Sequence, residues 1–170
     1  GLLEALRDRY RIDREVGRGS MATVFRAHDV RNDRWVALKL LHRGVGAAMG
    51  GERFREAVQS AARLEHPHIQ TVHDAGEDGA QFWFTMPFVD GETLHARLRR
   101  EGWLPVAEAL RIAREAAEAL DYAHRQGVTH RDIKPENILL SDGRVLVADF
   151  GIARALGGTR SGASRAGLPA

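Results

Sequence analysis

The pattern of apolar and polar positions in the first half of the chain predicts a small β-sheet with one helix. Apolar side chains at helical spacing predict a helix over residues 52–64, and Pro67 ends it. The small, glycine-rich residues 44–51 predict a loop. Alternating or short continuous apolar runs predict strands at residues 11–16, 23–27, 35–41, 69–72 and 81–86.

The next part of the chain predicts helices. After a turn at Asp90-Gly91, residues 93–100 predict a short helix. The longest predicted helix begins at Pro105 and is closed by Gly127. Because its apolar face is rich in alanine, we expect it to pack closely against other helices. That face consists of Val106, Ala109, Leu110, Ala113, Ala116, Ala117, Leu120 and Ala123.

Composition describes an ordinary globular protein and excludes several other classes. The 170 residues are 44% hydrophobic and 28% charged, and the length suffices for one domain with a sizeable core. The net charge of +2 is small and argues against a nucleic-acid partner. The chain has no cysteine, which excludes disulfides and cysteine-ligated zinc and fits a cytoplasmic location. No apolar run approaches about 18 residues, so we expect no membrane segment in this chain.

Two short motifs carry most of the chemical information. The sequence HRDIKPEN occupies residues 130–137, and twelve residues after Asn137 comes Asp149-Phe150-Gly151. The apolar run 145–148 just before Asp149 predicts a short buried strand, whereas Asp132 and Asn137 lie on an expected loop. The two motifs thus bring two carboxylates and an amide together, an arrangement suited to holding Mg²⁺ and to receiving a hydroxyl proton.

On these motifs the chain resembles serine/threonine protein kinases of the eukaryotic-like (Hanks) type, in their bacterial branch, from about Tyr10 to about Leu156. The resemblance implies an α+β, two-lobed kinase fold. A complete N-lobe with an antiparallel sheet and one helix is expected at residues 1–88, and a partial helical C-lobe at residues 89–156. The implied reaction transfers the γ-phosphate of ATP to Ser/Thr hydroxyls of proteins, with ATP and Mg²⁺ as cofactors and proteins as substrates.

The resemblance also assigns catalytic and metal-binding roles. Asp132 would orient and deprotonate the substrate hydroxyl, and Lys134 would steady the transferring phosphate. Asn137 and Asp149 would bind Mg²⁺ between the phosphates. Lys39 alternates with apolar neighbours on the strand 35–41 and should point inward, where it needs an anionic partner. In kinases that partner is the α- and β-phosphates.

A second expected partner of Lys39 is a glutamate on the helix 52–64. Kinases place it nine residues before the histidine of a His-Pro turn, which here is His66-Pro67, and the corresponding residue is Ala57. Glu56 lies one position away, about 100° around the helix. Either the helix is locally shifted and Glu56 reaches Lys39, or the ion pair is missing.

The nucleotide site is expected between a glycine-rich turn and an interlobe linker. Glycines in the segment 17–22 allow backbone N–H groups to approach phosphates. Segment 84–89 resembles the linker between lobes, whose backbone would hydrogen-bond adenine. The residues expected to contact the nucleotide are Val16, Gly17, Gly19, Val24, Ala37, Lys39, Met86, Phe88 and Leu139.

The resemblance ends after Leu156. Residues 157–170 hold glycine and arginine but no acid, and the Pro-Glu motif of kinases does not occur there. We therefore expect a divergent, disordered tail, and little or no activity from a chain that lacks the peptide-binding helices. Two alternatives to a kinase stay open: an ATP-binding, pseudokinase-like interaction fragment without phosphotransfer, and a non-functional truncation product.

Overall fold

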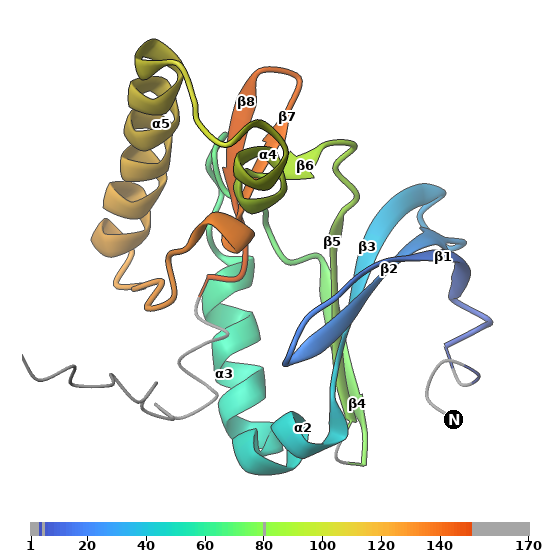
Figure 1. The fold of residues 1–170 in the computed structure, drawn as a ribbon. Coiled ribbons are helices and arrows are strands. Elements are labelled where there is room, and N and C mark those ends of the chain that lie inside the picture. The colour runs from blue at the N-terminus through green and yellow to red at the C-terminus, as the bar shows by residue number, and fades with distance from the viewer. Residues whose placement is uncertain (1–3, 5, 80, 151–170) are drawn as a thin grey trace, which may run out of the picture.

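The computed structural model describes residue 4, residues 6–79 and residues 81–150. A five-stranded antiparallel sheet lies on one side of the molecule, and two helices with a three-stranded sheet lie on the other (Figure 1). The helix α3 (Gly51–Ala62) stands between these two parts (Figure 1). This is the α+β arrangement that the sequence predicts, with the sheet and its helix encoded in the first half of the chain.

The five-stranded sheet has the strand order β1-β2-β3-β5-β4, and its two faces form two cores. Along β3, Val36 and Leu38 pack in a cluster with Tyr10 and Trp83, whereas Ala37 belongs to the cluster that contains Phe54 of α3. Successive side chains on a strand point to opposite faces, so Lys39 lies on the same face as Ala37. The strands are β1 (Tyr10–Arg18), β2 (Ala22–Asp29), β3 (Arg34–Leu41), β4 (Asp74–Asp78) and β5 (Gln81–Pro87).

The predicted loop at residues 44–51 is wrong, because α2 (Arg43–Met49) occupies most of it. Gly46 and Met49 are buried on one side of this short helix. Gly50, with φ of +77°, then separates α2 from α3. The glycines lower helix propensity, but burial of Met49 at 2% exposure stabilises the helix. The predicted helix 52–64 is confirmed as α3, with Phe54, Ala57 and Ala61 buried.

The predicted strand at residues 69–72 is also wrong. Ile69 forms only an isolated parallel bridge with Val147, and the neighbouring strand β4 begins later, at Asp74. Ile69 packs in the core around the helix α5 (Val106–Arg125), whereas Val72 packs in the core with Phe54. The apolar run therefore crosses from one core to the other instead of pairing along a single strand.

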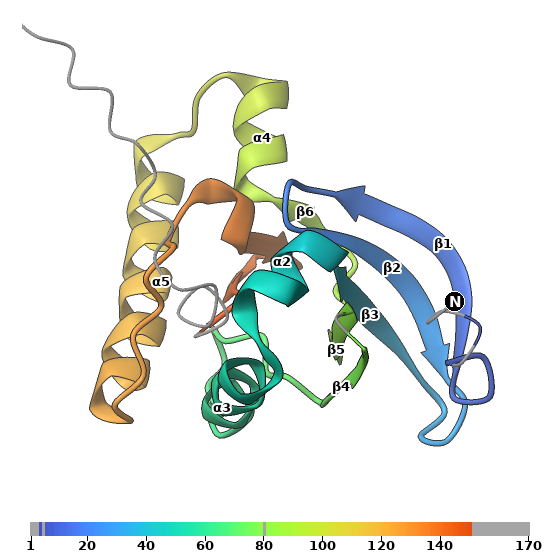
Figure 2. The ribbon, with the colours of Figure 1, turned by 90° about the horizontal axis from the view of Figure 1, so that it is seen from below.

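The second part of the molecule carries the remaining elements, and Figure 2 shows α4 and α5 beside each other from below. The helix predicted over 93–100 is confirmed, with the hydroxyl of Thr93 accepting a hydrogen bond from the Ala96 N–H at 3.0 Å, as an N-cap does. The sequence did not predict β6 or β7. The elements are β6 (Glu92–Thr93), α4 (Leu94–Glu101), α5 (Val106–Arg125), a 3-10 helix (Pro135–Asn137), β7 (Ile138–Ser141) and β8 (Arg144–Val147).

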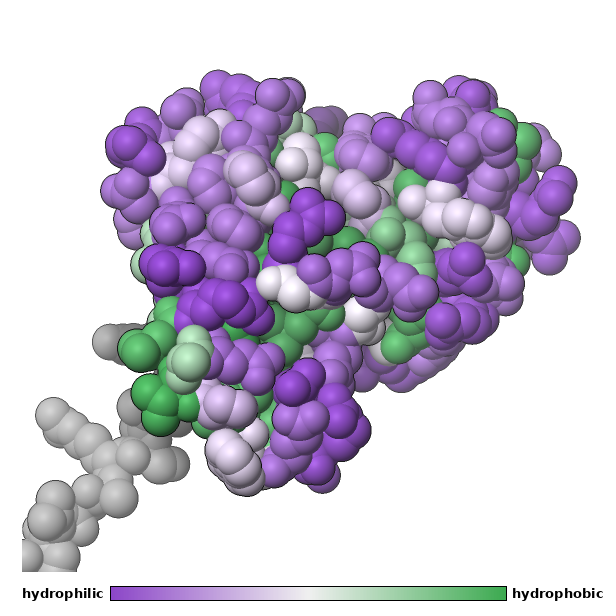
Figure 3. All heavy atoms as spheres, turned by 90° about the horizontal axis from the view of Figure 1, so that it is seen from above, coloured by the Kyte–Doolittle hydropathy of each residue, from purple (hydrophilic) through white to green (hydrophobic). Residues whose placement is uncertain are grey.

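The predicted packing face of α5 is largely wrong. Its buried residues are Ile112, Ala116, Ala119 and Ala123, whereas Val106 and Leu110 are 76% and 66% exposed. This orientation also places Glu115 on the packed side, where it accepts a hydrogen bond from the Val145 N–H at 2.9 Å. Seen from above, most of the surface is hydrophilic and hydrophobic surface gathers only in places (Figure 3).

Candidate active site

A cavity of about 500 Å³ lies where the five-stranded sheet meets the second part of the molecule. Most residues expected to contact a nucleotide or a metal line it, although they come from distant segments of the chain. Gly19, Asp132 and Lys134 are not among its lining residues. The expected residues that do line it are Val16, Gly17, Val24, Ala37, Lys39, Met86, Phe88, Asn137, Leu139 and Asp149.

Lys39 and Asp149 form an ion pair across this cavity, although 110 residues separate them. Both side chains are mostly buried, with 20% and 17% exposure. Lys39 reaches the cavity from β3, with its ammonium 5.9 Å from the ring centre of Phe84. Asp149 follows β8 and has a φ of +65°, a left-handed conformation that is uncommon for aspartate. The cavity thus places one cation and one carboxylate in direct contact.

The two alternatives for the partner of Lys39 on α3 are now distinguished. Ala57 is buried at 6% exposure in the core, and this orientation leaves Glu56 exposed to solvent. Among the residues that the structure describes, Asp149 is the only carboxylate found within ion-pair distance of Lys39. The structure therefore has the second alternative, in which no ion pair joins Lys39 to α3.

His130 fixes the start of the loop that carries Asp132. Its Nε2 lies 2.7 Å from the carbonyl oxygen of Ala148, and its Nδ1 accepts a hydrogen bond from the Asp132 N–H at 3.2 Å. Burial lowers the pKa of His130, which favours a neutral ring that donates from Nε2 and accepts at Nδ1. The ring also packs edge-on against Phe150, with ring centres 4.7 Å apart. The loop is thereby anchored to the residues on either side of Asp149.

Asp132, Lys134 and Asn137 form a hydrogen-bonded group beside the cavity. The Lys134 ammonium lies 2.7 Å from the Asp132 carboxylate. The Asn137 amide donates to the backbone carbonyl of Asp132 at 2.8 Å and to its carboxylate at 3.2 Å. The Ala148 N–H donates to the carbonyl of Asn137 at 2.9 Å, which joins this group to the chain before Asp149.

The donor atoms at this edge of the cavity suit Mg²⁺. Within the described residues, no group of three or more His, Cys, Asp and Glu side chains could hold a metal ion alone. Mg²⁺ in phosphate sites is, however, held by one or two protein oxygens together with phosphate oxygens and water. Asp149 offers a carboxylate, and Asn137 uses its Nδ2 on Asp132, which leaves its Oδ1 as an oxygen donor. The residues present therefore fit the metal.

The glycine-rich turn between β1 and β2 closes with a hydrogen bond from the Gly19 N–H to the Ala22 carbonyl at 2.9 Å. Space beside Gly17 is open, since a β-carbon built there would meet no atom within 4 Å. Neither glycine has a positive φ, so the backbone conformation alone does not require glycine at these positions. The open space beside Gly17 is consistent with close approach of a ligand.

Gln70 is one of the cavity residues that sequence reasoning did not assign to the site. Gln70 is buried at 7% exposure and lines the cavity, yet it lies in the apolar run 69–72, which was interpreted as a simple strand. The signal that could have found it is a single amide side chain within an otherwise apolar stretch. Gly151, the residues up to Leu156 and the expected disordered tail 157–170 lie outside the described residues.

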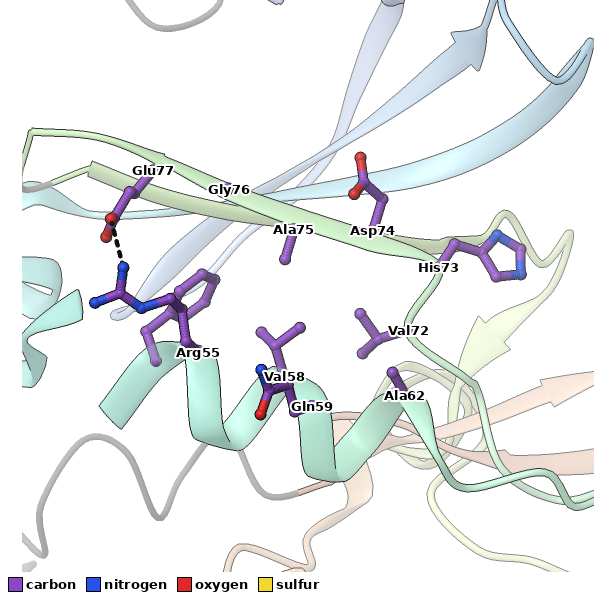
Figure 4. A pocket seen from close by; sticks show the side chains of 11 residues that line it. Arg55, Val58, Gln59, Ala62, Val72, His73, Asp74, Ala75, Gly76 and Glu77 are labelled. Atoms are coloured by element: carbon purple, nitrogen blue, oxygen red, sulfur yellow. Dashed lines mark hydrogen bonds and ion pairs between the residues drawn. The ribbon is translucent and has the colours of Figure 1, made fainter. Parts of the chain in front are cut away.

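A second cavity, of about 420 Å³, lies between α3 and β4. Figure 4 shows Val58 and Ala62 of α3 facing Val72 and Ala75, with an ion pair between Arg55 and Glu77 at one end. Its lining also includes Gln59, His73 and Asp74, and it contains none of the expected catalytic residues. The first cavity is therefore the candidate active site.

Comparison with known proteins identifies the family. The model of the protein kinase domain matches residues 10–168, which runs past Leu156, where we expected the resemblance to end. The chain is 48% identical over 149 residues to the serine/threonine-protein kinase PknD of Mycobacterium tuberculosis, covering 86% of this chain and 22% of that protein. It is 43% identical to the probable serine/threonine-protein kinase pknA2 of Bifidobacterium longum, covering 89% and 21%. The chain thus spans about a fifth of the length of these relatives.

Comparison with solved structures supports the same family. The crystal structure of the PknI kinase domain of Mycobacterium tuberculosis superimposes with a TM-score of 0.72 at 42% identity, over 84% of this chain and 60% of that one. Rad53 in complex with AMP-PNP gives a TM-score of 0.74 at 28% identity, over 84% and 38%. The sequence-based predictions of the α+β kinase fold and of the serine/threonine kinase family are confirmed. The chain belongs to the protein kinase domain family, among the serine/threonine protein kinases of bacteria.

Proposed function

We propose that this chain binds Mg·ATP in the cavity between its two parts and transfers the γ-phosphate to Ser/Thr hydroxyls of proteins. One observation carries the proposal. A single cavity brings together Lys39, Asn137 and Asp149 with the apolar side chains Ala37 and Met86. Charged groups for phosphates and metal thus adjoin apolar walls of a size that accepts a purine base. The reaction would take place in the cytoplasm, where ATP is found.

The roles of the charged residues follow from phosphoryl transfer. Its transition state spreads negative charge over the transferred phosphate, so positioned cations supply most of the stabilisation. Lys39 would contact the α- and β-phosphates from β3. Lys134, which is 39% exposed and bound to Asp132 beside the cavity, would neutralise the transferred group. Both lysines are held on carboxylates here, at Asp149 and Asp132, and nucleotide binding would exchange these carboxylates for phosphate oxygens.

Asp132 would orient the acceptor hydroxyl and receive its proton. Its carboxylate is 33% exposed, so an incoming hydroxyl can reach it, and its position is fixed by the bonds from Asn137. Asn137 and Asp149 would hold Mg²⁺ through their side-chain oxygens. When bound, the metal supplies positive charge to the phosphate oxygens. The base would lie among Val24, Ala37, Met86 and Leu139, with its edge at the linker after β5.

The composition of the chain allows a direct test of this site. Of its 25 Lys and Arg residues only two are lysines, Lys39 and Lys134. We expect an adenosine that carries an amine-reactive sulfonyl fluoride at its ribose end to modify Lys39, and Mg·ATP to protect against it. Peptide mass spectrometry locates the modified amine, and Lys134, outside the cavity lining, serves as the internal control. Equal modification of both lysines, without protection by Mg·ATP, would contradict the proposal.

A second candidate is nucleotide binding without phosphotransfer. One observation favours it: Lys39 contacts the proposed metal ligand Asp149 and no carboxylate of α3, so its position depends on Asp149 alone. Transfer of labelled phosphate from ATP to a serine-containing protein distinguishes the two candidates, since only the first predicts it. The same assay measures our expectation of little or no activity from the 170-residue chain.

A further inference from the structure

The glycine-rich turn between β1 and β2 is attached to the chain that carries Lys39, and His42 makes the attachment. Gly17 on β1 pairs with Val24 on β2, and Val24 pairs with Lys39 on β3. All three line the cavity, so they form one row across the sheet at the cavity wall. His42 is the first residue after β3 and comes three residues after Lys39. It therefore stands next to the tip of the turn, residues 19–21, which connects β1 to β2 beyond this row.

Three nitrogen atoms of His42 contact the turn and the strand that follows it. The backbone N–H of His42 donates to the carbonyl of Met21 at 2.9 Å. The ring Nδ1 lies 3.1 Å from the carbonyl oxygen of Ser20, and the ring Nε2 lies 3.2 Å from the hydroxyl of Thr23. Because a carbonyl only accepts, Nδ1 carries the proton and donates to Ser20. In the neutral ring, Nε2 is then the acceptor for the Thr23 hydroxyl, which is 4% exposed and needs a partner.

The contacts of His42 use the acceptors of the tip and leave its donors free. Within the part of the chain that the structure describes, nothing accepts a hydrogen bond from the N–H of Ser20 or of Met21. A trans peptide is planar, with its C=O and N–H on opposite sides. The ring contact with the Ser20 carbonyl therefore fixes the direction of the Met21 N–H, which belongs to the same peptide unit. Free backbone N–H groups in a turn are suited to binding an anion.

We propose that His42 is a positioning residue of the phosphate site, which holds the glycine-rich turn in register with Lys39 so that the N–H groups of its tip bind the phosphates of the nucleotide. This inference rests on the proposed nucleotide site. Without the ring contacts, the tip would lose more conformational freedom on binding, which lowers affinity. The apolar wall for the base lies elsewhere in the cavity, at Met86 and Leu139. His42 should therefore affect the binding of the phosphates and not that of the base.

Equilibrium binding of Mg·ATP and of adenosine, which lacks the phosphates, tests the proposal. His42→Phe keeps a ring and the backbone bond to Met21 but loses both ring nitrogens. We expect its affinity for Mg·ATP to fall about tenfold, the effect of one or two hydrogen bonds, and its affinity for adenosine to change less than about twofold. His42→Gln should recover most of the ATP affinity, because its amide carries a donor for Ser20 and an acceptor for Thr23. His28→Phe, at a half-buried position of β2 outside the cavity lining, is the matched control and should bind both ligands like the parent chain.

The outcomes separate this inference from the proposed function. Absence of binding of either ligand to the parent chain overturns both. Unchanged ATP affinity in His42→Phe, or an equal loss of affinity for ATP and adenosine, overturns the positioning role alone, as does a failure of His42→Gln to recover the affinity for ATP. Should His42→Phe not fold, Thr23→Val replaces it, because it removes the hydroxyl that bonds to the ring at similar volume. A loss of affinity for ATP but not for adenosine in Thr23→Val supports the proposal, and any other result overturns it.

Discussion

Asn137 donates from one amide nitrogen to both the backbone carbonyl and the carboxylate of Asp132, at 2.8 and 3.2 Å. The proposed metal ligand thus holds the proposed proton acceptor, and the carbonyl of Asn137 is bonded in turn to Ala148, next to Asp149. Metal binding and acceptor positioning are consequently carried by one connected group of residues.

Substitution of Asp132 should therefore separate transfer from binding. In Asp132→Asn the side chain keeps its shape but loses its basicity. In a version of the chain extended to full length, we therefore expect this substitution to lower phosphotransfer by about a hundredfold or more, the usual contribution of a positioned acid or base. Affinity for Mg·ATP should change less than about threefold, because Asp132 does not line the cavity. Transfer of radiolabelled phosphate and nucleotide titration measure the two effects. Parallel loss of both activities would contradict the assigned role, and Asp121→Asn on α5 is the matched control.

The ion pair between Lys39 and Asp149 leads to a prediction about the metal. Asp149→Asn removes the charge that would bind Mg²⁺, so affinity for ATP in the presence of Mg²⁺ should fall roughly ten- to a hundredfold, or about 1.5–3 kcal/mol. Affinity for metal-free ATP should stay the same or rise, since Lys39 is released from its partner. Calorimetric titration with and without Mg²⁺ measures both.

The control for this experiment is Asp142→Asn. Asp142 lies exposed on the turn between β7 and β8 with φ of +47°, a conformation that asparagine tolerates well. The Asp142→Asn variant should bind ATP with the same dependence on Mg²⁺ as the parent chain. A metal dependence in Asp149→Asn that equals that of Asp142→Asn would exclude Asp149 as the metal ligand.

Sequence reasoning found the elements whose apolar pattern follows a single strand or helix. The run 35–41 alternates between two faces of a single sheet, and β3 forms there. The run 69–72 fails because Ile69 and Val72 belong to different cores, which no local pattern encodes. The face of α5 was missed for a similar reason, since Glu115 bonds to a strand that lies 30 residues further along the chain.

In the candidate site, too, local contacts could be predicted from the sequence and contacts between distant segments could not. Motifs with close spacing, such as Asp132 to Asn137, could be placed from the sequence because one loop holds them. The ion pair of Lys39 with Asp149 spans 110 residues, and the choice between Glu56 and Ala57 depended on the rotation of α3. Gln70 could not be assigned from the sequence because its side chain bonds to Pro87 at the end of β5, 17 residues further along the chain.

Close packing beside the cavity predicts the effect of a small substitution. A β-carbon at Gly91 would lie 2.2 Å from the backbone oxygen of Leu140 on β7, an atom that cannot move without shifting the strand. Gly91→Ala should therefore destabilise the fold by about 1–3 kcal/mol. Gly44→Ala in α2, where a β-carbon meets no atom within 4 Å, should instead stabilise it by about 0.5–1 kcal/mol. Urea unfolding of the two variants measures both free energies, and equal effects would contradict the packing of Gly91.

The last prediction concerns acid sensitivity at His130. Burial lowers the pKa of this ring from its ordinary value of 6.5, so the folded chain holds it neutral while the unfolded chain takes up a proton more readily. Its contribution to stability is accordingly complete above about pH 6.5 and is lost as the pH falls from there toward the folded pKa. We expect the free energy of unfolding of the parent chain to decrease between about pH 7 and pH 5.

His130→Gln should keep a donor and an acceptor for Ala148 and Asp132 but cannot titrate. The variant should be less stable than the parent at pH 7.5, yet its free energy of unfolding should fall less on acidification. Part of the pH dependence should remain, because burial also lowers the pKa of His66 and His73. Urea unfolding at a series of pH values measures the slope. His124→Gln, at an exposed position of α5, should retain the parent slope. If His130→Gln also retains it, the ring is not held neutral by the fold, and the hydrogen bond from Asp132 to its Nδ1 cannot be what positions the loop.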